Sequence, residues 1–159
     1  MVVRALAYLL LLLCAACVSA PPLEKIVLLA PFEGRQRDLG YEALYAVRLA
    51  LAESDTSLHL LAIDSGTAPN AYQAHLRAIN QDPAVRFVLL VGDDGDSNKR
   101  LDWLERPFHW IQAQEFPPPD FVERYQASAE FAPPASPLAY AAYQATQALI
   151  ADLLNDVRQ

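Results

Sequence analysis

Three short apolar runs, separated by segments with helical periodicity, constrain the fold of this chain most strongly. The runs at residues 25–30 and 86–92 are unbroken and rich in Val, Ile and Leu, and a third lies at 58–64. Continuous apolar runs of this length are typical of parallel strands that are buried on both faces. Between them, residues 41–53 and 70–80 carry apolar side chains at helical spacing. This alternation predicts right-handed βαβ units in a parallel sheet.

The second half of the chain shows the same kinds of element less regularly. Its expected elements are a short helix, a strand and two longer helices, at residues 98–105, 107–112, 120–131 and 138–157. Ser136 followed by Pro137 is a typical start for the last helix, because serine caps a helix and proline fits its first turn. A chain of 159 residues has the size of one domain. We therefore expect an α/β fold, a single three-layer domain with a flavodoxin-like parallel sheet of three or four strands.

The first twenty residues have the layout of an export signal. Arg4 supplies a positive charge, and residues 5–16 are apolar or small but too few to span a bilayer comfortably. The segment Cys14-Ala-Ala-Cys17 resembles the lipobox of bacterial lipoproteins, which implies that Cys17 becomes the acylated first residue. The alternatives are cleavage after Ala20, which gives a secreted protein, and an uncleaved anchor. We expect an extracytoplasmic, lipid-anchored protein with a signal at 1–16, a linker at 17–24 and a folded domain at 25–157.

Composition argues against several classes of function. The formal net charge is −7 and the 12 Lys and Arg residues are scattered, whereas binding to nucleic acid requires clustered cations. Both cysteines lie in the first twenty residues, so the domain holds neither disulfides nor a zinc-thiolate site. The chain contains no P-loop, dinucleotide-binding turn or G-x-S-x-G motif, and His59, His75 and His109 lack metal-ligand spacing. We therefore expect a protein that is not an enzyme and uses no cofactor.

Two parts of the chain carry a family resemblance. The segments KIVLLAPFEG (25–34) and YEALYAVRLALAE (41–53) are followed by Asp82-Pro-Ala-Val85 before a strand that ends at Gly92. This pattern resembles the type 1 periplasmic solute-binding proteins of the branched-chain amino-acid group, and residues 120–155 are similar to the closing helices of that family. Family members have two lobes that close on a ligand. Here the matching stretches lie almost back to back, so the resemblance implies a single lobe.

The resemblance also implies a function and a set of partners. The expected function is non-covalent recognition of a small polar, amino-acid-like solute, in the context of an ABC transporter or of sensing, at a membrane reached through the lipid anchor. The alternative is a lipid-anchored scaffold that kept the fold and binds only protein partners. A homodimer that rebuilds a cleft from two copies is a further hypothesis. The scaffold hypothesis depends on four aromatic residues that fit either an exposed docking patch or, as we favour, the core: Trp103, Phe108, Trp110 and Phe116.

The candidate ligand site lies in the loops after the first and third strands, because the ligand crevice of an open parallel sheet is at the carboxyl ends of its strands. Arg35 and Arg37 near a helix N-terminus could hold an anion, although we favour the alternative that they are two solvated arginines on a loop. The resemblance places Ser97 where a family hydroxyl bonds the ligand. The acidic residues beside it depart from the family pattern and would repel a carboxylate: Asp93, Asp94 and Asp96. The candidate ligand-binding residues are Phe32, Glu33, Gly34, Arg35, Asp93 and Ser97. Asp64 ends a strand before Ser-Gly and is interpreted as a turn-former.

The acidic segment after the third strand also matches a calcium loop. Positions 1, 3, 5, 9 and 12 of that template fall on Asp94, Asp96, Asn98, Asp102 and Glu105. Oxygen ligands at alternating positions suit Ca²⁺. However, Lys99 replaces the glycine of the template, and a strand precedes the loop instead of a helix. The alternative is a solvated turn whose acids favour the N-terminus of a short helix.

Overall fold

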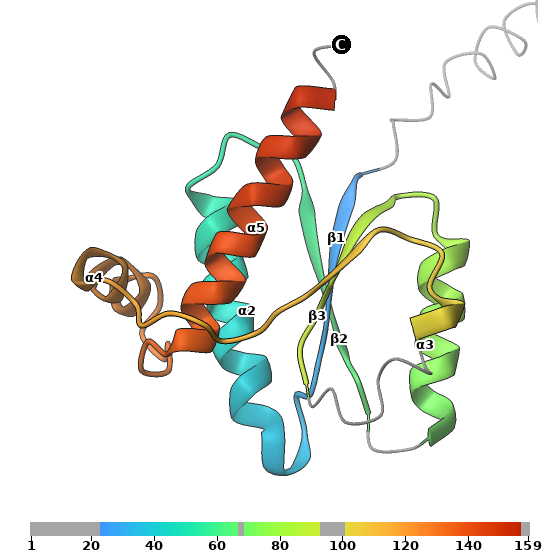
Figure 1. The fold of residues 1–159 in the computed structure, drawn as a ribbon, viewed down its shortest axis with the longest axis horizontal. Coiled ribbons are helices and arrows are strands. Elements are labelled where there is room, and N and C mark those ends of the chain that lie inside the picture. The colour runs from blue at the N-terminus through green and yellow to red at the C-terminus, as the bar shows by residue number, and fades with distance from the viewer. Residues whose placement is uncertain (1–22, 67–68, 93–100, 157–159) are drawn as a thin grey trace, which may run out of the picture.

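A four-stranded parallel sheet forms the centre of the protein (Figure 1). The computed structural model describes residues 23–66, 69–92 and 101–156. Within these residues the strands are β1 (Lys25–Ala30), β2 (His59–Asp64), β3 (Val85–Leu90) and β4 (Phe108–Trp110). Their order in the sheet is β2-β1-β3-β4, and every neighbouring pair is parallel. The predicted α/β fold is confirmed, with the strand order of a flavodoxin-like, doubly wound sheet.

Helices cover both faces of the sheet. The longest two, α2 (Arg37–Ala52) and α5 (Pro137–Asp156), lie side by side on one face. The shorter α4 (Pro119–Ala127) lies next to this pair, on the side away from the sheet (Figure 1). The opposite face is covered by α3 (Pro69–Gln81) and a 3-10 turn, η3 (Leu101–Trp103). The layers are therefore helix, sheet and helix, as predicted. No helix of the described ranges is long and apolar enough to cross a membrane.

Strand β1 explains why the sequence shows an unbroken apolar run. Ile26 and Leu28 belong to the core beneath α2 and α5, whereas Val27 and Leu29 belong to the core beneath α3. All four side chains are at most 1% exposed. A strand between two helical layers has no face turned to water, so it shows no alternation of polar and apolar residues.

Two helix starts differ in how well the sequence predicted them. Ser136 Oγ accepts a hydrogen bond from the Ala139 N–H at 3.1 Å, and α5 begins at Pro137 as expected. In contrast, α2 begins at Arg37, four residues before the predicted start at Tyr41. Arg37 and Asp38 at its start are polar and exposed, so the sequence pattern predicts a loop there instead of a helix. The predicted signal, including Cys17, lies outside the described residues.

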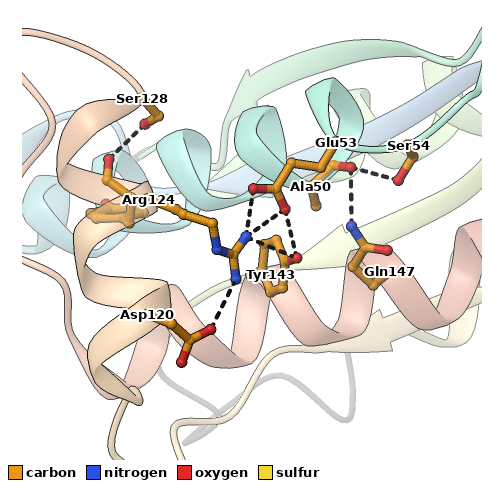
Figure 2. Close-up of polar contacts among 9 residues, drawn as sticks. Ala50, Glu53, Ser54, Asp120, Arg124, Ser128, Tyr143 and Gln147 are labelled. Atoms are coloured by element: carbon orange, nitrogen blue, oxygen red, sulfur yellow. Dashed lines mark hydrogen bonds and ion pairs between the residues drawn. The ribbon is translucent and has the colours of Figure 1, made fainter.

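A polar network joins α2, α4 and α5 (Figure 2). Arg124 Nη1 donates to the two carboxylate oxygens of Glu53 at 2.5 and 2.6 Å, and the Tyr143 hydroxyl donates to Glu53 Oε2 at 2.7 Å. The Arg124 guanidinium also lies 5.3 Å from the centre of the Tyr143 ring. Burial raises the pKa of Glu53, but the hydrogen bonds from Arg124 and Tyr143 outweigh it and hold the pKa of this carboxyl below its ordinary value.

The network predicts a pH-dependent contribution to stability. A carboxyl whose pKa is lower in the folded than in the unfolded state stabilises the fold above its unfolded pKa, and the contribution is lost as pH falls through the folded pKa. We expect Glu53→Gln to lower the free energy of unfolding at pH 7 by about 1 kcal/mol, because solvent screens this half-exposed pair. The difference from wild type should shrink below about pH 4.5, as measured by urea unfolding. Glu123→Gln, on the exposed surface of α4, should cause no such change.

Candidate functional site

A pocket of about 290 Å³ lies at the carboxyl ends of β1 and β2. It is formed by the loop after β1, which includes the 3-10 turn η1 (Gly34–Gln36), and by the turn after β2. Its lining residues are Pro31, Glu33, Gly34, Arg35, Gln36, Asp64, Ser65 and Gly66. The pocket therefore lies at the end of the sheet where the sequence predicts the ligand site.

Asp64 holds the two loops of the pocket together. Its Oδ1 accepts a hydrogen bond from the Phe32 N–H at 2.6 Å, and its Oδ2 accepts one from the Gly66 N–H at 3.1 Å. The Ser65 N–H donates to the Ala30 carbonyl at 2.8 Å, which extends the pairing of β2 with β1 by one residue. Asp64 therefore forms the turn that we predicted, and it also fixes the neighbouring β1 loop.

Two glycines let the pocket walls turn sharply. Gly34 has φ +73° and Gly66 has φ +71°, values in the left-handed region that other residues rarely adopt.

The side chain of Gln36, the N-cap of α2, makes no capping hydrogen bond. The N-terminus of α2, which is the positive end of its helix dipole, lies beside the pocket, because Gln36 is also a lining residue.

The pocket presents charges of both signs. Arg35 is exposed and lines the wall next to the N-terminus of α2. Glu33 and the half-buried Asp64 supply carboxylates on the same lining. Arg37, the first residue of α2, is exposed and does not line the pocket, and its Nε lies 3.6 Å from Asp38 Oδ1. This arrangement suits a small solute that carries both an anionic and a cationic or hydrogen-bonding group.

The structure brings together only part of the predicted ligand set. Glu33, Gly34 and Arg35 line the pocket, whereas the half-buried Phe32 packs edge-on against Tyr41, with ring centres 5.6 Å apart. Asp93 and Ser97, on the loop after β3, lie outside the described residues.

The sequence analysis did not predict that the turn after β2 forms part of the pocket. The predicted parallel pairing could have indicated it, because the carboxyl ends of β1 and β2 must lie next to each other.

Two of the five calcium candidates are described, and they do not form a cluster. Asp102 is exposed in η3, and the Glu105 N–H donates to Asn80 Oδ1 at 3.0 Å. In the parts of the chain with described positions, no three His, Cys, Asp or Glu side chains are placed to hold a metal ion. The other candidates, Asp94, Asp96 and Asn98, lie outside those parts.

The favoured core assignment of the aromatic residues is wrong for three of the four. Trp103, Phe108 and Phe116 are 45%, 43% and 88% exposed. Trp110 is half-buried and packs against the core beneath α3. Within the described ranges β4 is an edge strand of the sheet, and Phe108 is its first residue.

Comparison with known proteins gives no match: no family model, no curated protein and no solved structure matches this chain. The resemblance to type 1 solute-binding proteins therefore stays a prediction from the residues quoted above.

Proposed function

We propose that this protein is an extracytoplasmic, lipid-anchored, solute-binding-like protein that recognises a small polar solute without covalent chemistry. The pocket at the carboxyl ends of β1 and β2 is the observation that supports this function most directly. It lies at the carboxyl end of the sheet, the end where open parallel sheets bind ligands, next to the point between β1 and β3 where the strand order reverses. Its lining combines Arg35 with Glu33 and Asp64.

The size of the pocket limits the solute. A volume of about 290 Å³ is at the low end for small-molecule sites, and it suits a ligand of the size of an amino acid. The described residues form one lobe, with no opposing domain over the pocket. A ligand held by one lobe keeps part of its hydration, so we expect weak binding, with a dissociation constant on the order of a millimolar.

Titration calorimetry with a panel of amino acids and related polar solutes tests this function. At least one solute should bind the wild-type protein. For that solute, Arg35→Gln should weaken binding by about tenfold or more, because it removes a charge-assisted hydrogen bond to the anionic group. Arg37→Gln is the matched control, since it removes an equal charge from the first residue of α2, which does not line the pocket, and it should leave the affinity within about twofold of wild type. Equal losses in the two variants would contradict a specific role for Arg35.

The exposed aromatic residues favour one alternative, a scaffold that binds only protein partners. Large apolar side chains that stay open to solvent are enriched at protein interfaces. Trp103, Phe108 and Phe116 provide such side chains here. If no solute of a broad panel binds at millimolar concentration, the scaffold function is favoured over the solute-binding function.

A further inference from the structure

We propose that a second pocket, at the opposite end of the sheet, binds a small amphiphilic carboxylate such as hexanoate or octanoate. This pocket has a volume of about 330 Å³ and lies where the amino ends of β3 and β4 meet the last turns of α5. The chain enters β1 at this end of the sheet, whereas the pocket of the proposed solute is at the carboxyl end (Figure 1). The two sites are therefore separate.

The wall beneath α5 is apolar. It includes Phe87 from β3 and Leu149 and Leu153 from α5, all half-buried. Phe87 and Leu149 pack against the main core, so this wall is an extension of the core that remains open to a ligand. An alkyl chain placed here would remove apolar surface from water on both partners, which is the main source of affinity for such ligands.

A fixed guanidinium stands at the rim of this wall. Arg106 Nη2 donates to the carbonyls of Asn80 and Asp82, at 3.1 and 2.9 Å, so the C-terminal end of α3 and the residue after it hold the half-buried side chain in place. Among the described residues no carboxylate lies within ion-pair distance of Arg106, although its charge interacts through space with the Asp82 carboxylate, which is paired with Lys25. Arg86 also lines the pocket, but its Nε already lies 3.6 Å from Glu24 Oε1. Arg106 therefore keeps its charge and its Nη1 and Nε donors, each of which can give an anion a single charge-assisted hydrogen bond.

Asp152 limits the charge of the ligand. It is exposed and is the only acidic side chain that lines this pocket in the described part of the chain. Its carboxylate opposes a ligand with several negative charges more strongly than a singly charged one. An apolar wall, one fixed cation and one opposing acid together select a singly charged head on a short alkyl chain.

A chain-length series tests the apolar wall. Titration with acetate, butanoate, hexanoate and octanoate, below the concentration at which they form micelles, should tighten binding about three- to fourfold per methylene group. Octylammonium has an alkyl chain one carbon longer than that of octanoate and the opposite charge, and despite the extra carbon it should bind at least tenfold more weakly than octanoate. Equal binding of octanoate and octylammonium, or affinity that does not depend on chain length, would overturn the proposal.

Variants locate the site. Arg106→Gln should weaken octanoate binding about tenfold or more, and Leu153→Asn should weaken it about fivefold. The neighbouring Leu154→Asn is the matched control, because Leu154 is exposed on the same helix and does not line the pocket. Asp152→Asn should tighten binding, a gain that no loss of folding can produce. Arg35→Gln should leave octanoate binding unchanged, because Arg35 lines the other pocket. The experiments can therefore contradict octanoate binding and solute binding independently of each other. Unchanged affinity in both Arg106→Gln and Leu153→Asn would contradict this location.

Discussion

Replacing Phe121 with alanine is expected to lower the free energy of unfolding by about 4 kcal/mol, the cost typical of a large cavity in a core. Phe121 is fully buried where α4 meets α2 and α5. Its ring lies 5.4, 5.0 and 5.2 Å from the ring centres of Tyr125, Tyr140 and Tyr143, so alanine removes three aromatic contacts as well as buried apolar surface. We expect the loss to appear as a lower midpoint of urea unfolding, with the slope unchanged.

Phe131→Ala is the matched control for this change. Phe131 lies beyond the end of α4 and is 79% exposed, so the same truncation should alter stability by less than about 0.5 kcal/mol. If Phe121→Ala lowered the free energy of unfolding as little as Phe131→Ala, this result would contradict the packing of α4 against α2 and α5 in the structure.

Replacing Gly40 with alanine is expected to cost about 3 kcal/mol, although alanine is the better helix former by about 1 kcal/mol. A Cβ atom at this position would lie 2.0 Å from the Pro31 carbonyl oxygen and 2.8 Å from its carbon. Both atoms are backbone, so the first turn of α2 or the β1 loop must move. The same movement would displace Glu33 and Arg35, so we expect Gly40→Ala to weaken solute binding in any fraction that still folds.

Thermal unfolding monitored by circular dichroism measures the effect of Gly40→Ala. The reverse exchange, Ala74→Gly on the exposed face of α3, is the control for helix propensity alone and should cost about 1 kcal/mol. A Gly40→Ala protein as stable as wild type would show that α2 does not approach Pro31 this closely.

The sequence predicted the sheet well because burial on two faces leaves a strong local pattern. The unbroken apolar runs of β1 and β3 need no information from distant residues. The start of α5 could also be predicted from the local sequence alone, because Ser136 caps the helix that Pro137 begins.

Features that depend on distant residues were not predicted. Glu53 is 71 residues from Arg124 and 90 from Tyr143, so nothing in the local sequence indicates that they meet. Whether Phe108 is covered depends on whether a strand follows β4 in the sheet. The β2 side of the pocket became visible only when β2 was placed beside β1, which brings Asp64 and Gly66 next to Gly34.

Amide chemical-shift mapping tests the central claim, that the carboxyl-end pocket of one α/β lobe binds a small polar solute. Uniformly ¹⁵N-labelled protein is titrated with the tightest solute of the amino-acid panel. The account predicts shifts concentrated in residues 32–38 and 64–66, with the amides of Gly34 and Gly66 among the most affected. Shifts that instead spread evenly over the chain, or that cluster at the amino ends of the strands, would contradict it.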